Sequence, residues 1–250
     1  MKNILVIPDT QVREGVNTDH LEAAGNFAVY HKPDNIVFIG DVADTPSLSM
    51  YNNKKEAQGL TVKGDMEQGI HAVERLLRPL RRAKGYNPSI TMCSGNHEPS
   101  VRIKRLYGDR PELEGCIDDE FERYLLTNGI KVVPFLEVET IEGIAFSHYF
   151  CNPSSLKGNP VSGMIESCIK NVGHSFVAGH QQGLKMGKRY LANGEVHLGI
   201  ICGSFYSHEE SYMSKQSNHH WRGIVHLMNA SEGDADIQEV NLKTLLRDYM

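Results

Sequence analysis

The sequence predicts an α/β fold whose C-terminal third is mostly β-structure. In the first 180 residues, short runs rich in β-branched residues alternate with stretches of helical periodicity, which is typical of layered α/β proteins. Each short run ends in a polar or glycine-containing turn. After residue 184 the helical patterns give way to strands separated by turn signals.

Five short apolar runs are the expected strands of the first part of the chain. Each is bounded by turn-forming residues and is too short for a helix, which favours buried strands. They are residues 3–7, 35–39, 89–93, 144–146 and 175–178.

Four helices are expected between these strands, at residues 19–31, 62–84, 117–128 and 161–172. The second has an apolar face that indicates packing against the core, with Pro79 expected to bend its end. That face consists of Ile70, Val73, Leu76, Leu77 and Leu80. Its arginines Arg75, Arg78 and Arg82 share another face, which is either solvated or a track for a phosphodiester backbone.

The last third of the chain predicts a hairpin and two closing strands. Residues 184–191 and 196–202 flank an Asn193-Gly194 turn, a strong hairpin signal. Residues 223–228 and 235–242 are the two further strands.

Composition narrows the class of protein. The chain has 250 residues, of which 40% are apolar and 23% charged, as expected for one domain spanning 1–250. Within it, residues 46–88 are a probable helical insertion that either caps the active site, forms an interface or is a peripheral surface helix. The net charge of −5 gives no global field that would attract nucleic acid. No apolar run could span a bilayer, and five cysteines without a C-x-x-C pair favour the cytoplasm.

Metal-competent side chains follow the expected strands at the point where each strand ends. In open α/β sheets ligands bind beyond the carboxyl ends of the strands, so these residues should converge. Buried strand ends gain nothing from carboxylates and imidazoles that lack partners. The set is Asp9 and Gln11, Asp41 and Asp44, Asn96 and His97, His148, and His180 and Gln182.

The order of these motifs resembles the calcineurin-like metallophosphoesterases, with a phage-encoded branch as the nearest likeness. Their pattern is D-x-H, G-D-x-x-D, G-N-H-[DE], a lone H and G-H-x-H. The corresponding segments here begin at Asp9, Gly40, Gly95, His148 and Gly179. The resemblance implies a four-layer α/β/β/α sandwich with a metal centre at the edge of the two sheets.

The resemblance also implies a role for each motif residue. Asp41 would bridge two divalent metal ions. Asn96, His148 and His180 would complete the shell of one ion, and Asp9, Gln11 and Gln182 that of the other. His97 would be the catalytic imidazole, with Asp44 accepting its other N–H and fixing its tautomer. The implied reaction is hydrolysis of a P–O ester bond by metal-activated water.

Two positions depart from the family pattern, because Gln11 and Gln182 stand where it has histidine. Both belong to the same implied site, which becomes all-oxygen and is expected to bind its ion weakly. Mn²⁺ is the first choice for both sites, with Mg²⁺, Zn²⁺, Fe or Ni²⁺ as alternatives. If the first site stays empty, the chain would instead be a non-catalytic phosphate-binding module.

The motifs do not separate the possible substrates. A phosphodiester, as a nucleotide or nucleic acid, is the first choice, and a phosphomonoester or phosphoprotein the alternative. Arg102 and Arg105 follow the third motif closely and could bind a substrate phosphate through two hydrogen bonds each. The segment 207–222 contains the only tryptophan, Trp221, which either stacks on a base or anchors the segment. A phage-encoded enzyme of this kind would act in the host cytoplasm.

Overall fold

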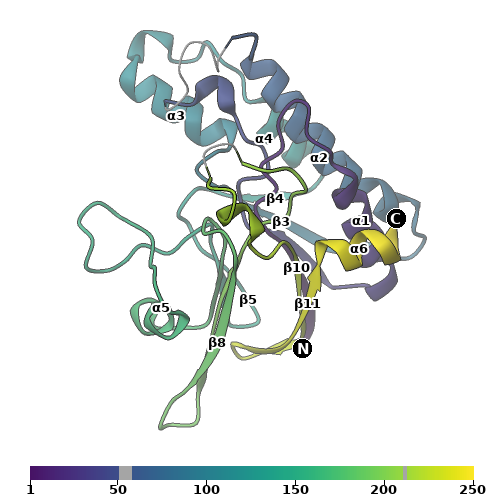
Figure 1. The fold of residues 1–250 in the computed structure, drawn as a ribbon, viewed down its shortest axis with the longest axis vertical. Coiled ribbons are helices and arrows are strands. Elements are labelled where there is room, and N and C mark those ends of the chain that lie inside the picture. Colours follow the sequence, from purple (N-terminus) through teal and green to yellow (C-terminus); the bar gives the residue numbers. More distant parts are fainter. Residues whose placement is uncertain (51–57, 211–212) are drawn as a thin grey trace.

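Two β-sheets stacked face to face form the centre of the computed structural model, which describes residues 1–50, 58–210 and 213–250. Helices cover the outer face of each sheet, and Figure 1 shows α5 and α6 on opposite sides of the stack. The predicted α/β class is therefore confirmed, and the layers follow the order α/β/β/α.

The first sheet has the strand order β11-β10-β1-β2-β3-β4. Its four neighbouring strands from β1 to β4 run parallel, so their carboxyl ends share one edge. β10 and β11 extend the sheet in antiparallel fashion. The strands are β1 (Lys2–Ile7), β2 (Asn35–Phe38), β3 (Ser89–Cys93), β4 (Lys131–Val133), β10 (Gly223–Ser231) and β11 (Asp234–Asn241).

The second sheet has the order β5-β6-β7-β9-β8. Its middle strands β6, β7 and β9 are parallel to one another, and β5 and β8 are antiparallel edge strands. The strands are β5 (Glu139–Ile141), β6 (Ile144–Phe146), β7 (Phe176–Ala178), β8 (Leu184–Tyr190) and β9 (Val196–Cys202). The predicted hairpin of β8 and β9 is present.

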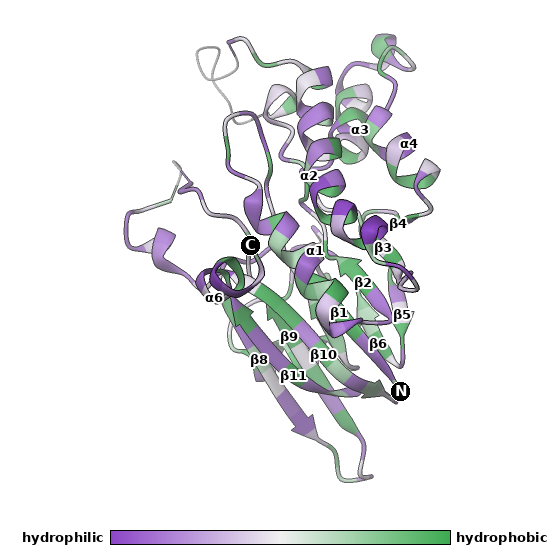
Figure 2. Ribbon diagram, turned by 90° about the vertical axis from the view of Figure 1, so that its right-hand side faces the viewer, coloured by the Kyte–Doolittle hydropathy of each residue, from purple (hydrophilic) through white to green (hydrophobic). Residues whose placement is uncertain are grey.

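Alternation along the strands separates two apolar cores. Ile4 and Val6 of β1 face the second sheet, whereas Leu5 and Ile7 face the helices. A third cluster packs Ile169 of α5 against the outer face of the second sheet. Figure 2 shows the contrast between the apolar inner strands and the more hydrophilic edge strands β8 and β11.

Six α-helices and three short 3₁₀-helices lie within the described residues. Of these helices, none combines the length and the apolar character needed to cross a membrane. The α-helices are α1 (Asp19–His31), α2 (Val62–Arg82), α3 (Pro99–Asp109), α4 (Glu120–Thr127), α5 (Ile165–Val172) and α6 (Leu242–Tyr249). The 3₁₀-helices are η1 (Pro46–Leu48), η2 (Pro111–Leu113) and η3 (Ser217–His219).

Helix α2 supplies most of the region expected as an insertion, of which residues 51–57 lie outside the described ranges. Its predicted apolar face is buried, with Leu76 and Leu80 in the core beneath α1. Arg75 turns to α1, where it pairs with Asp19 at 2.6 Å and with Glu22 at 3.0 Å, whereas Arg82 is exposed. The helix thus belongs to the outer layer, and Arg75 is engaged by α1 rather than exposed as a phosphate track.

Two helices and two strands were not anticipated: α3, α6, β4 and β5. Pro99 at the first position of α3 was a start signal, because proline is favoured there. Asn241 caps α6 by accepting a hydrogen bond from the Thr244 amide at 3.0 Å. The expected strand 235–242 therefore ends at Asn241, and the C-terminal third closes with a helix.

A buried histidine in α1 should make the fold sensitive to acid. His20 packs edge-on against Phe205 with ring centroids 4.7 Å apart, and neither ring nitrogen makes a hydrogen bond of ordinary geometry with the described residues. Burial, reinforced by His208, lowers the pKa of His20 to about 3. Because the folded pKa lies below the unfolded value, stability is complete above about pH 6.5 and is lost as pH falls towards 3.

The variant His20→Leu is expected to lose this sensitivity. Between pH 7.5 and pH 5, the stability lost by the native protein should exceed that lost by the variant by about 2 kcal/mol. Urea denaturation at the two pH values measures the difference, with the exposed His71→Leu as control. An equal loss in the native protein and His20→Leu would show that His20 is not the cause.

Candidate metal centre

Backbone hydrogen bonds join the first motif, which begins at Asp9, to the second, which begins at Gly40. The Gln11 amide donates to the Asp41 carbonyl at 2.8 Å, the Val12 amide to the Val42 carbonyl at 2.9 Å, and the Asp44 amide back to Val12 at 2.9 Å. Gln11 and Asp41 have φ values of 43° and 50°. Non-glycine residues adopt this left-handed conformation only where surrounding contacts hold them, which is common at functional sites.

Glu98 is the residue that holds the second and third motifs in place. Its buried carboxylate accepts hydrogen bonds from three backbone amides: Asp41 at 3.0 Å, Val42 at 2.6 Å and Gly95 at 2.7 Å. Burial, together with Asp41, raises its pKa to about 7. The sequence contained Glu98 in the Gly-Asn-His-Glu motif but gave no sign of this clamping role.

Glycines let the backbone approach the ligand side chains. A Cβ atom at Gly95 would lie 2.2 Å from Asp41 Oδ1, and one at Gly179 would lie 2.4 Å from Asp9 Oδ1. Both distances are far shorter than a van der Waals contact, so a side chain at either position would force neighbouring atoms to shift. The glycine before each motif is therefore required by the close packing of the carboxylates.

Asp41, His148 and His180 form the group best suited to hold a metal ion. Their ligand atoms lie within 4.8 Å of one another. Asn96 joins them, because its Oδ1 lies 3.1 Å from His148 Nε2. His148 Nδ1 donates to the Ile39 carbonyl at 3.0 Å, which leaves Nε2 directed at Asp41 and Asn96. A backbone partner on one ring nitrogen is the usual arrangement of a metal-binding histidine.

The electrostatics of this group favour a cation. Burial alone would lower the pKa of His148, but Asp41 and Asp9 raise it to about 10. Burial would likewise raise the pKa of Asp41, yet His148 and His97 hold it well below its usual range. Positive charge on the imidazole thus balances the buried carboxylates, a role that a divalent ion could take over on displacing the proton. Burial, with His148 nearby, lowers the pKa of His180 to about 4, so its ring is neutral and able to bind metal.

Asp9 and Gln182, which are expected at the first site, each have a defined hydrogen-bond partner. Asp9 is fully buried, and its carboxylate accepts the His180 amide at 3.0 Å. Burial raises the pKa of Asp9 to about 8, with a further contribution from Asp41. Gln182 Oε1 accepts a hydrogen bond from the Tyr206 hydroxyl at 3.1 Å, which fixes the position of this oxygen. A second lone pair on Oε1 stays available for a metal ion. Carboxylate and amide oxygens are suitable ligands for Mn²⁺ or Mg²⁺.

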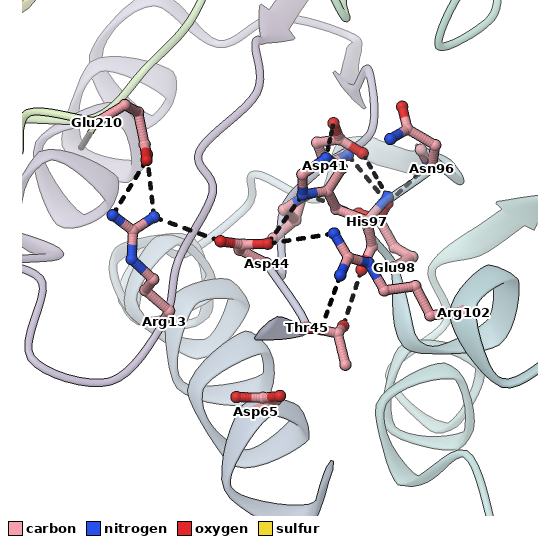
Figure 3. Close-up of polar contacts among 12 residues, drawn as sticks. Arg13, Asp41, Asp44, Thr45, Asp65, Asn96, His97, Glu98, Arg102 and Glu210 are labelled. Carbon is pink, nitrogen blue, oxygen red and sulfur yellow. Dashed lines mark hydrogen bonds and ion pairs between the residues drawn. The ribbon is translucent and has the colours of Figure 1, made fainter. Parts of the chain in front are cut away.

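His97 and Asp44 make a dyad beside this centre (Figure 3). His97 Nδ1 donates to Asp44 Oδ1 at 2.8 Å, so Nε2 is the free nitrogen, and it lies 4.0 Å from Asp41 Oδ2. Burial opposes protonation of His97, but Asp41 and Asp44 raise its pKa above the ordinary value. The ring is 27% exposed and therefore accessible to a substrate.

The two arginines expected to bind substrate are placed differently from each other. Arg102 is 8% exposed, and its guanidinium donates to the Thr45 carbonyl at 3.0 Å and lies 3.6 Å from Asp44 Oδ1. These contacts make it a buried support of Asp44, and contact with substrate stays a prediction. Arg105 is exposed on α3, where it remains the better candidate for a phosphate contact.

The segment 207–222, of which residues 211 and 212 lie outside the described ranges, packs against the site. Trp221 contacts the core between the sheets, as expected of an anchor. His220 Nε2 lies 2.7 Å from Ser204 Oγ, next to the end of β9. Glu210 of this segment reaches Arg13, a contact that no motif indicated.

Restoring histidine at the two departing positions should strengthen the first site. In a Gln11→His, Gln182→His variant, two imidazoles replace amides, and we expect Mn²⁺ affinity of the weaker site to rise on the order of tenfold or more. Calorimetric titration of metal-stripped protein measures this, with the exposed Gln58→His as control. An unchanged weaker site would mean that these positions do not contact a metal.

Two known proteins are similar to the chain in sequence, and no family model matches it. The Gene 54 protein of Mycobacterium phage D29 is 32% identical over 143 residues, covering 53% of this chain and 54% of that protein. The Gene 54 protein of Mycobacterium phage L5 is 35% identical over 98 residues, covering 39% of this chain and 36% of that protein. The matched part is thus about half of the relatives' length or less.

Two solved structures are similar over most of the chain. One is a dimetal phosphatase from Danio rerio, with 12% identity, a TM-score of 0.41 and coverage of 96% of this chain and 98% of that one. The other is YfcE, a phosphoesterase from E. coli, with 11% identity, a TM-score of 0.41 and coverage of 96% and 99%. Similarity at this level does not support a functional assignment, which has to be argued from the side chains described above.

Proposed function

We propose that this chain is a calcineurin-like metallophosphoesterase, which hydrolyses a P–O ester bond with the help of two divalent metal ions. The observation that carries the proposal is the grouping of Asp41, His148 and His180 close to the His97–Asp44 dyad. The potential ligand atoms of Asp41, His148 and His180 lie within 4.8 Å of one another. His97 Nε2 lies 4.0 Å from Asp41 Oδ2. The phage relatives support a phage-encoded protein that acts in the host cytoplasm.

The residues would divide between two ions, with Asp41 contributing to both shells. Asn96, His148 and His180 would hold one, and Asp9, Gln11 and Gln182 the other. When bound, the ions lower the pKa of a water molecule and offset negative charge on the phosphate. Mn²⁺ is our choice for both sites, because it suits carboxylate and amide oxygens, which both ligand sets contain.

His97 supplies the proton chemistry. With Nδ1–H donated to Asp44, Nε2 is oriented towards the centre and carries a proton when the ring is charged. A charged His97 stabilises negative charge on the phosphate oxygens, and Nε2 can give its proton to the leaving alkoxide. Asp44 contributes by keeping the ring in this tautomer and orientation.

A phosphodiester of a nucleotide or nucleic acid is the substrate that we propose. The exposed Arg105 on α3 could bind a non-bridging oxygen of such a phosphate. A phosphomonoester or phosphoprotein is the second candidate, since it would use the same metal chemistry. A non-catalytic phosphate-binding module is the third, favoured by the glutamines at positions 11 and 182.

Metal reconstitution tests the proposal. Metal-stripped protein is titrated separately with Mn²⁺, Mg²⁺, Zn²⁺ and Ni²⁺ while hydrolysis of bis-p-nitrophenyl phosphate and p-nitrophenyl phosphate is followed. We expect Mn²⁺-dependent turnover, faster on the diester. Faster turnover of the monoester would favour a phosphatase, and metal binding without turnover on either ester or on single-stranded DNA would favour the binding module.

A further inference from the structure

Glu210 is linked to the His97–Asp44 dyad through Arg13, and it comes from a part of the chain that contains none of the motifs. It lies in the connection between β9 and β10 and is only 4% exposed. Its carboxylate accepts hydrogen bonds from both terminal nitrogens of Arg13, at 2.9 and 3.2 Å (Figure 3). It also accepts a hydrogen bond from His208 Nε2 at 2.7 Å. Arg13 and His208 more than offset the effect of burial and lower the pKa of Glu210 to about 2, so it is ionised.

Arg13 connects Glu210 to Asp44 through hydrogen bonds. The nitrogen that contacts Glu210 Oε1 also donates to Asp44 Oδ2 at 3.3 Å. The other carboxylate oxygen, Oδ1, accepts His97 Nδ1 at 2.8 Å. Asp44 is therefore held on one side by Arg13 and on the other by His97, with Arg102 near Oδ1 at 3.6 Å.

This chain of contacts restricts how Asp44 can move. A carboxylate bound through only one oxygen can rotate, whereas contacts on both oxygens define its plane. Arg13 can make this connection because its planar guanidinium has several donors in a fixed geometry, which a lysine ammonium lacks. Glu210 holds that guanidinium by both terminal nitrogens and so fixes its direction.

Stability alone is a weak reason for such an arrangement. Buried ion pairs often add little net stability, because desolvation of both charges offsets their attraction. Glu210 and Arg13 are 197 residues apart, so their pairing also ties the 203–222 connection to the first motif. A purely structural tie would not need the second contact of Arg13 with Asp44.

We propose that Arg13 and Glu210 are positioning residues for His97, which act through Asp44. The proposal rests on the proposed function, since it concerns the same dyad. Glu210 orients Arg13, Arg13 orients Asp44, and Asp44 holds the imidazole with Nε2 towards the centre. Loss of either residue should then affect the chemical step and leave substrate and metal binding in place.

Steady-state kinetics of Mn²⁺-loaded protein test this chain of contacts. For Glu210→Gln and Arg13→Lys we expect kcat to fall about 10–100-fold, as for outer-sphere partners of a site, with KM changed less than twofold. Glu209→Gln removes the same charge from the exposed neighbour and should match the native protein. In an Asp44→Asn background, Glu210→Gln should have no further effect, because the pathway is already broken.

An NMR measurement on metal-free protein gives a readout that does not depend on turnover. The Nδ1 proton of His97, bonded to Asp44, should give a downfield imidazole signal that is absent from His97→Ala. In Glu210→Gln and Arg13→Lys the signal should shift or broaden, and in Glu209→Gln it should not. If the protein hydrolyses no ester but the signal behaves in this way, the proposed function fails while the positioning role stands.

The opposite result would overturn the positioning role. It is refuted if both variants keep the native signal and kcat, or if their losses remain in the Asp44→Asn background. If Glu210→Gln does not fold, Arg13→Lys alone decides the matter, because it keeps the positive charge beside Glu210 and removes only the planar guanidinium.

Discussion

Replacing His97 by alanine is expected to reduce turnover about 10²–10⁴-fold, the usual contribution of a general acid or base. Binding of both metal ions should be unaffected, because His97 contacts Asp41 only through its backbone amide at 2.9 Å and at a ring distance of 4.0 Å. Measuring kcat on the preferred ester and metal content by mass spectrometry separates the two effects. The imidazole would then be assigned to chemistry and not to metal binding.

His71→Ala is the matched control for His97→Ala, since His71 is an exposed histidine on α2. It should retain native turnover and native metal content. Turnover of His97→Ala within a few-fold of the native protein would contradict the assignment of His97 as the proton donor. Loss of metal together with turnover would instead make the imidazole a ligand.

Asp41→Asn is expected to have the largest effect on metal binding. The amide keeps an oxygen that can accept the His97 N–H, so the loop should retain its shape. It lacks the charge that would be shared by two ions, so we expect affinity at both sites to fall by more than the roughly 10–100-fold typical of outer-sphere partners. Calorimetric titration with Mn²⁺ measures the affinities, and turnover should fall with them.

Asp65→Asn provides a control with the same chemical change. Asp65 is 3% exposed and accepts the Ser47 amide at 2.9 Å, but it belongs to neither expected metal shell. Its replacement should leave both affinities unchanged. If Asp41→Asn still bound two Mn²⁺ ions with native affinity, Asp41 could not be the shared ligand.

The parts of the site that depend on strand order could be predicted from the sequence. Asp9, Asp41 and His148 each follow a short apolar run, and parallel strands place their carboxyl ends at a common edge. The lengths of the runs and their bounding turns were sufficient to predict the α/β class and most strands. Helix α3 was not predicted, although Pro99 at its first position is a helix-start signal.

The supporting contacts could not be predicted, because they depend on turn geometry and on distant segments. Three backbone amides donate to the Glu98 carboxylate, and one of them belongs to Asp41, whose left-handed conformation no sequence pattern indicated. Arg13 and Glu210 are 197 residues apart, so no local sequence pattern indicates that they pair. Arg102 was expected at a substrate phosphate since it follows the third motif, whereas α3 turns its guanidinium towards Thr45.

Diffraction from crystals grown with Mn²⁺ tests the central claim most directly, since the anomalous signal locates each ion without reference to a substrate. We predict two peaks, one beside His148 and His180 and one beside Asp9, with Asp41 in contact with both. The peak beside Asp9 should weaken first as Mn²⁺ is lowered, because its shell is all oxygen. Ions found elsewhere, or none at saturating Mn²⁺, would contradict a metal centre at this edge of the sheets.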